Sequence, residues 1–231
     1  MKKIIILLTM LITACTLIDQ PIIADTSNGF LTTEDKVKIY YSYEKIPTNK
    51  AVILIHMLDR SHTDWNAFSK RLHKTNFSTL AIDLRGHGKS DLNWEEFSEK
   101  DFNNMLLEIK SAKEFLKKEN YTEISIIGAS IGANLALNYA SNDQDINKLV
   151  LLSPSEDYRG IKTLSNLNNF NNSLLIATGS KDIKSYIGSK KINESFKGNR
   201  KLLMYNTENH GTILLLSHFE LNKEIIEFLK A

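Results

Sequence analysis

The stretch Gly128-Ala129-Ser130-Ile131-Gly132 places the tightest constraint on the fold of this chain. It follows a β-branched apolar run at 124–127 and precedes a helix-like run at 133–140. Glycine two residues on either side of Ser130 suits a turn where a strand and the next helix cross closely, because larger side chains do not fit there easily. The pattern therefore predicts a buried strand, a sharp turn at Ser130 and a helix.

The same turn places a serine hydroxyl at a helix N-terminus, where free N–H groups and the positive dipole end stabilise the negative charge of acyl transfer. Such a hydroxyl needs a base that takes its proton and an acid that orients the base. Asp182 follows an apolar strand-like run, and His210 lies between the last strand-like and helix-like runs. The chain order serine, acid, histidine predicts a catalytic triad of Ser130, Asp182 and His210.

Alternatives stay open for two members of this triad. Asp182 could instead cap the helix expected over 183–195, in which case Asp157 is the substitute acid. Besides His210, only His218 follows Asp182, and it lies within the last amphipathic segment. That position makes His210 the better base.

The other histidines are assigned structural roles. His56 and His87 are expected to bond loop backbone near the site, whereas His62 and His73 look like surface residues. Histidine, cysteine and acidic residues show no metal-ligand spacing. The glycines flanking His87 lack the third glycine and the helix of a dinucleotide-binding loop. We therefore expect neither a metal nor a cofactor.

Strand-like and helix-like segments alternate along the chain, which predicts an α/β fold with a mostly parallel sheet of about eight strands and helices on both faces. The segment between residues 153 and 173 is short and asparagine-rich, so we expect a loop there and no substantial cap domain. The expected strands are 29–33, 36–43, 51–56, 77–83, 123–128, 146–152, 174–178 and 201–205. The expected helices are 64–75, 98–119, 131–141, 183–195 and 212–229.

Two further motifs accompany the serine turn. His56-Met57-Leu58, followed by Asp64-Trp65, is similar to a His-Gly strand-loop with its downstream tryptophan. Residues 83–90 match the pattern D-x-R-G-x-G-x-S. Together with G-x-S-x-G, G-x-x-D and a late His-Gly, these motifs make residues from about 30 to 231 resemble the α/β-hydrolase superfamily. The resemblance is to its small capless serine esterases, of the carboxylesterase and dienelactone-hydrolase types; the latter usually carry a cysteine where this chain has Ser130.

That resemblance implies how the site would work. Ser130 would attack an acyl carbonyl, His210 would act as base and then as acid, and Asp182 would hold its tautomer. The oxyanion hole would use the N–H of Ile131 and one N–H from the loop after His56, that of Leu58 or alternatively of Met57. Met57 departs from the family, which usually has glycine there, so its side chain narrows the site, shifts which amide points inward, or lines an acyl pocket.

The resemblance also sets the range of activities to consider. The expected function is hydrolysis of an ester with a small or exposed acyl substrate. A thioesterase or peptidase would use the same triad. A non-catalytic exported binding lipoprotein that retains the fold is the third possibility.

The N-terminal residues form a predicted export signal. Lys2 and Lys3 precede an apolar run that ends in Ile12-Thr13-Ala14-Cys15, which resembles a bacterial lipobox. We therefore expect a lipoprotein signal peptide over 1–14, a lipidated Cys15 with a tether over 15–27, and a hydrolase domain over 28–231. This places the protein in the cell envelope, anchored to a membrane. Cleavage after Ala24, or an uncleaved anchor, are the alternatives.

Composition limits the remaining partners. The formal net charge is +2, to which Lys2 and Lys3 contribute both units, so no basic excess remains to bind nucleic acid. Cys15 is the only cysteine, so no disulfide can form within the chain. The sequence does not predict an oligomeric state.

Overall fold

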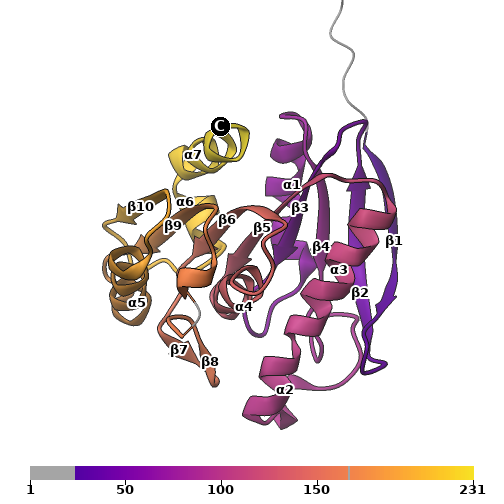
Figure 1. Cartoon of the computed structure of the whole chain (residues 1–231), viewed down its shortest axis with the longest axis horizontal. Coiled ribbons are helices and arrows are strands. Elements are labelled where there is room, and N and C mark those ends of the chain that lie inside the picture. The colour runs from indigo at the N-terminus through magenta and orange to yellow at the C-terminus, as the bar shows by residue number, and fades with distance from the viewer. Residues whose placement is uncertain (1–23, 166) are drawn as a thin grey trace, which may run out of the picture.

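The computed structural model describes residues 24–165 and 167–231, so the predicted signal peptide and Cys15 lie outside the described residues. Its centre is an eight-stranded sheet in the order β1-β2-β4-β3-β5-β6-β9-β10 (Figure 1). These strands are β1 (Asp25–Thr32), β2 (Lys38–Lys45), β3 (Lys50–Ile55), β4 (Ser78–Ile82), β5 (Glu123–Ala129), β6 (Ile146–Leu152), β9 (Ser173–Gly179) and β10 (Arg200–Tyr205). The predicted sheet of about eight strands is confirmed.

Strand direction determines where loops gather. β2 is antiparallel to both β1 and β4, whereas β4, β3, β5, β6, β9 and β10 run parallel. The carboxyl ends of the six parallel strands therefore share one edge of the sheet. In open α/β sheets this edge is where ligand-binding loops meet.

Helices cover both faces of the sheet, as predicted. One layer consists of α1 (Asn66–His73), α6 (Ile213–Ser217) and α7 (Phe219–Lys230). The other consists of α2 (Glu99–Asn104), α3 (Leu106–Lys118), α4 (Ile131–Ala140) and α5 (Ile183–Ser195). Alternate residues of the strands pack into the two layers: Ile53 and Ile55 face α4, whereas Val52 and Leu54 face α1. This alternation explains why the central strands read as continuous apolar runs.

Two predicted long helices are each divided. The helix expected over 98–119 breaks at Met105. The N–H of Met105 donates to the carbonyl of Phe102, three residues earlier, whereas an α-helix bonds to the fourth residue back. The segment expected over 212–229 breaks at His218, which has an extended backbone and stacks on Tyr205 with ring centroids 4.4 Å apart. His218 therefore lies between α6 and α7 and not inside a helix.

Two boundaries also differ from expectation. β1 begins at Asp25, so the strand includes residues 25–27 of the predicted tether. The segment after β6 is not all loop, because β7 (Asp157–Tyr158) and β8 (Ile161–Lys162) form a hairpin. Arg159 and Gly160 adopt the positive φ angles, 55° and 80°, that a two-residue hairpin turn favours. No large cap is built on this segment among the described residues.

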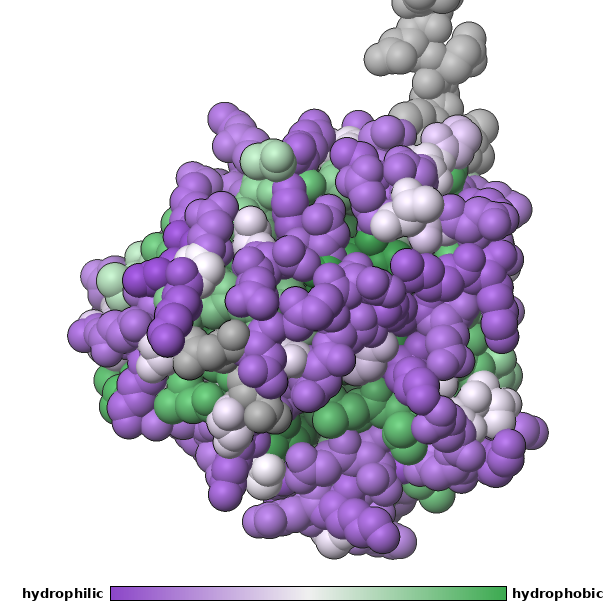
Figure 2. All heavy atoms as spheres, in the orientation of Figure 1, coloured by the Kyte–Doolittle hydropathy of each residue, from purple (hydrophilic) through white to green (hydrophobic). Residues whose placement is uncertain are grey.

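Figure 2 shows that the face toward the viewer is covered mainly by hydrophilic side chains, with smaller apolar areas between them. Among the described residues, no helix combines the length and apolar character needed to span a membrane.

Candidate active site

Ser130 occupies the sharp turn between β5 and α4. Its φ and ψ angles are 53° and −117°, a strained conformation for a residue with a side chain. The flanking glycines are required by close contacts: a Cβ on Gly132 would lie 2.6 Å from the His56 carbonyl oxygen, and a Cβ on Gly128 would overlap the Gly132 carbonyl. The predicted strand, turn and helix are thus present, with the serine at the helix N-terminus.

Asp182 and His210 are brought together from two different loops. Asp182 follows β9, His210 follows β10, and the His210 Nδ1 to Asp182 Oδ2 distance is 2.6 Å. Asp182 stands at the N-cap position of α5, but its side chain makes no capping hydrogen bond. Burial alone would raise the pKa of Asp182, yet hydrogen bonds from His210 and Ser185 hold this pKa below its usual range. The carboxylate therefore stays ionised and orients the imidazole.

The substitute acid is placed elsewhere. Asp157 lies exposed on β7, and its carboxylate accepts a hydrogen bond from the Gly160 N–H at 3.1 Å. Asp182 is therefore the acid that the geometry supports.

The histidine loop (residues 209–212) packs against the serine turn. A Cβ built on Gly211 would lie 3.4 Å from Ala129 Cβ, the residue before Ser130. The Gly211 N–H donates to Ser153 Oγ at 3.0 Å, and Ser153 has a φ of 53° at the end of β6. Sequence reasoning missed Ser153, although its position before Pro154 at a strand end marks a turn.

The three predicted triad residues thus share one edge of the sheet. No hydrogen bond joins Ser130 to His210 within residues 24–165 and 167–231. Because Asp182 holds Nδ1, Nε2 is the His210 nitrogen that can take a proton from the serine.

The β3 loop (residues 57–61) contains the candidate oxyanion donors. His56 Nδ1 donates to the Met57 carbonyl at 2.6 Å, and its Nε2 accepts from the Leu84 N–H at 2.9 Å. In a trans peptide the N–H points opposite to the C=O. The N–H of Leu58 therefore points away from the His56 ring, and Leu58, with Met57 as the alternative, stays the predicted donor. These bonds also confirm that His56 binds loop backbone, as His87 does through the Arg85 carbonyl.

Met57 packs into the core beneath the histidine loop. Its side chain is buried and belongs to the core cluster that includes α1, α6 and α7, and its sulfur lies directly against Gly211. The Met57 side chain, which stands where the family usually has glycine, therefore packs against the core-facing side of the histidine loop. This packing argues against the alternative in which Met57 lines an acyl pocket.

Two histidines are not surface residues as predicted. His62 lies at the start of the 3-10 helix η1 (His62–Trp65), and Asp83 Oδ1 accepts hydrogen bonds from its N–H at 2.6 Å and its Nδ1 at 2.8 Å. His73 is buried on α1, with Nδ1 3.0 Å from Glu44 and Nε2 3.0 Å from Thr79. Asp83 follows β4, Glu44 lies on β2 and Thr79 lies on β4. Local sequence does not reveal these contacts between elements.

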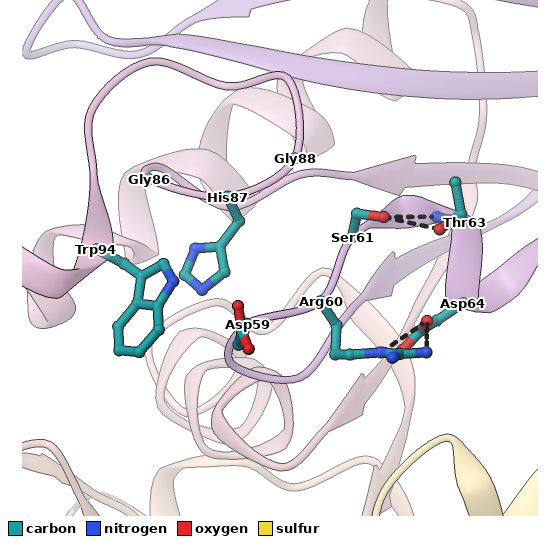
Figure 3. Close-up of a pocket in the computed structure, with 9 residues that line it drawn as sticks. All are labelled: Asp59, Arg60, Ser61, Thr63, Asp64, Gly86, His87, Gly88 and Trp94. Carbon is teal, nitrogen blue, oxygen red and sulfur yellow. Dashed lines mark hydrogen bonds and ion pairs between the residues drawn. The ribbon is translucent and has the colours of Figure 1, made fainter.

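A cavity of about 380 Å³ adjoins the β3 loop. Its walls are residues 59–61, 63–64 and 86–88 together with Trp94, and Figure 3 shows the His87 ring between Trp94 and Asp59. No group of three or more histidine, cysteine or acidic side chains in the described part of the chain is placed to hold a metal ion.

The buried His56 makes stability depend on pH. Burial, together with the neighbouring His87, lowers the pKa of His56 to about 4, against about 6.5 in an unfolded chain. Between these two pKa values the unfolded state binds more protons than the folded state. The contribution of His56 to the free energy of unfolding therefore falls as pH falls from about 6.5 to 4. We expect a loss of about 2–3 kcal/mol between pH 7.5 and 4.5.

Urea unfolding of wild type and His56→Gln at both pH values measures this loss. The comparison with the variant is needed because Glu108, whose pKa burial raises to about 7, acts in the opposite direction. It contributes stability that is present below about pH 4.5 and lost as pH rises through 7. Equal pH dependence in the two proteins would contradict the role given to His56.

Comparisons with known proteins identify the family of the chain. Residues 46–181 match the family model described as serine aminopeptidase, S33. The chain belongs to this family of α/β hydrolases. A Bacillus subtilis α/β-hydrolase superfamily protein, YisY, is 29% identical over 126 residues, which cover 54% of this chain and 44% of the relative. An uncharacterized Mycobacterium tuberculosis protein is 29% identical over 45% of this chain and 28% of its own length. The chain thus spans less than half the length of these curated relatives.

Solved esterase structures share the whole fold. The Pyrococcus furiosus esterase Pf2001 has a TM-score of 0.77 at 23% identity, covering 90% of this chain and 91% of that one. An Exiguobacterium antarcticum esterase has a TM-score of 0.72 at 16% identity, covering 89% and 100%. At these identities the likeness establishes the α/β-hydrolase fold and leaves the substrate open.

Proposed function

We propose that this protein is a serine hydrolase that cleaves esters of small or exposed acyl substrates through an acyl-enzyme intermediate. The observation that carries the proposal is the 2.6 Å pairing of His210 with Asp182 on the edge of the sheet where Ser130 occupies the strained turn. A carboxylate-oriented imidazole on the same sheet edge as a half-buried serine turn is the arrangement that can activate a hydroxyl. The absence of a large cap from the described fold suits small or exposed substrates.

The reaction follows from these positions. Ser130 Oγ attacks the acyl carbonyl while His210 Nε2 takes the hydroxyl proton, and the N–H groups of Ile131 and Leu58 stabilise the oxyanion. The tetrahedral intermediate then expels the alcohol, which receives the proton from His210. Water, deprotonated by His210, attacks the acyl-enzyme; the acid is released and Ser130 regains its proton.

The first experiment is labelling of the purified protein with a fluorophosphonate, beside Ser130→Ala. This reagent reacts with an activated serine, so we expect labelling of wild type and none of the variant. A screen of esters, thioesters and amino-acid anilides then separates the leaving groups, and the family's aminopeptidase name makes the anilides a necessary part. A folded wild type that is neither labelled nor active on any of these would favour the non-catalytic binding lipoprotein.

We also propose that Cys15 is lipidated and anchors the exported protein to a membrane of the cell envelope. Asp25 pairs with Lys45 on β2, at the end of the sheet where β4 begins, whereas Ser130 follows the carboxyl end of β5 at the opposite end of the sheet. Figure 1 shows the strands concerned. An anchor preceding β1 would therefore join the domain on the edge remote from the site. This arrangement suits acyl esters that reach the protein from outside the anchoring bilayer.

Cell fractionation tests the anchor. We expect Cys15→Ala to move from the membrane fraction to the soluble fraction, because lipidation requires the thiol. Retention of the variant in membranes would instead indicate an uncleaved apolar anchor.

A further inference from the structure

One carboxylate joins the β3 loop to the histidine loop. Asp64, on η1, accepts hydrogen bonds from Arg60 Nε at 3.0 Å and Arg60 Nη2 at 2.7 Å (Figure 3). Its Oδ2 also accepts from Thr212 Oγ1 at 3.0 Å. Arg60 lies two residues after Leu58, and Thr212 lies two residues after His210. The same side chain therefore contacts both segments that flank the candidate site.

Asp64 is the fixed part of this connection. Its side chain is only 6% exposed, whereas that of Arg60 is 55% exposed. Its neighbour Trp65 is fully buried in the core, and the two hydrogen bonds from His62 to Asp83 hold the start of η1. The position of the carboxylate is therefore set by the core, and the two loops are held to it.

The histidine loop depends on few such contacts. Asp182 holds the imidazole of His210, Ser153 holds the N–H of Gly211, and Asp64 holds the hydroxyl of Thr212. Thr212 is buried, so removal of Asp64 would leave its hydroxyl without this partner. Met57 of the β3 loop also packs against Gly211, and the Thr212–Asp64–Arg60 hydrogen bonds add a polar connection between the same two loops.

We propose that Asp64 is a positioning residue, which fixes the spacing between the β3 loop and the histidine loop across the reacting carbonyl. The inference rests on the proposed function. The oxyanion donor and the general base act on opposite sides of the same tetrahedral intermediate, so their separation affects the transition state more than substrate binding. Because displacements of about 1 Å cost about 100-fold in rate, loss of this contact lowers kcat and leaves KM nearly unchanged.

A merely structural role predicts a different result. An ion pair with an exposed partner such as Arg60 contributes about 0–1 kcal/mol to stability. If Asp64 had only this role, its removal would leave kcat unchanged. The exposed Lys223–Glu227 pair on α7, with N and O 3.7 Å apart, provides a matched control through Glu227→Gln.

The test compares kcat and KM for a small aryl ester in a series of variants. We expect Asp64→Ala to lower kcat about 10- to 100-fold with KM changed less than about 3-fold. Thr212→Val, which removes the hydroxyl, lowers kcat about 10-fold. Thr212→Ser, which keeps the hydroxyl, retains most of the wild-type kcat. In Asp64→Ala combined with Thr212→Val the losses are not additive, because both changes remove one contact.

Three results would overturn the proposal. They are a kcat for Asp64→Ala within about 2-fold of the Glu227→Gln control, equal losses in Thr212→Val and Thr212→Ser, and additive losses in the double variant. If Asp64→Ala fails to fold, the kcat values of the two Thr212 variants test the proposal.

A second readout separates this inference from the proposed function. If wild type hydrolyses nothing, the proposed function fails, but the NMR signal of the His210 Nδ1 proton still reports on the histidine loop. We expect that signal to shift or broaden in Asp64→Ala and Thr212→Val and to stay unchanged in Glu227→Gln. An unchanged signal in the first two variants counts against the positioning role.

Discussion

Replacing His210 by alanine is expected to lower kcat for ester hydrolysis by about 10⁶-fold, the size of loss seen when the base of a serine hydrolase is removed. His210 is the only imidazole that the described structure pairs with Asp182, at 2.6 Å. Without it, nothing takes the proton from Ser130 or returns it to the leaving alcohol. Asp182→Asn is expected to lower kcat about 10⁴-fold, because the amide no longer favours the Nδ1–H tautomer.

These losses are measured as kcat and KM on a small aryl ester, with unfolding midpoints to show that the variants fold. His218→Ala is the matched control, since His218 also follows Asp182 in the chain but stacks on Tyr205 between α6 and α7. We expect its kcat to stay close to that of wild type. Hydrolysis by His210→Ala within about 10-fold of wild type would remove His210 from the mechanism.

Features of the fold that depend on neighbouring residues could be predicted from the sequence. The turn at Ser130 was predictable because its requirements lie within five residues, two of them glycines whose hydrogens leave room for the crossing backbone. The parallel sheet was predictable because strands buried on both faces read as continuous apolar runs. Chain order then placed Asp182 and His210 at one edge.

Features that depend on distant partners were not predictable. His62 looked exposed because its partner Asp83 lies 21 residues away. The divided helices end where tertiary contacts form, such as the stacking of His218 on Tyr205, and the hairpin β7–β8 is too short to show a period. Asp64 and Thr212 are separated by 148 residues, and no local pattern connects them.

The close crossing at the serine turn leads to the largest expected effect on folding. A Cβ on Gly132 would lie 2.6 Å from the carbonyl oxygens of both Ile55 and His56, and both are backbone atoms that cannot rotate away. Either α4 or the end of β3 must move, so we expect Gly132→Ala to lower the free energy of unfolding by about 3 kcal/mol, at the upper end of the usual cost of overpacking. The move would also displace the Ile131 N–H and the β3 loop, so the folded fraction should lose activity too.

Urea unfolding of Gly132→Ala beside Gly29→Ala separates this effect from the general cost of replacing a glycine. Gly29 lies on the edge strand β1, and the atoms nearest to a Cβ there belong to the Tyr41 side chain, which can shift where a backbone carbonyl cannot. We expect that control to change the free energy of unfolding by less than about 1 kcal/mol. Equal effects at the two positions would mean that the β5–α4 crossing is not the cause. A loss of stability at Gly132 alone would show that the close crossing of β5 and α4, which places Ser130 on its turn, also limits the stability of the central sheet.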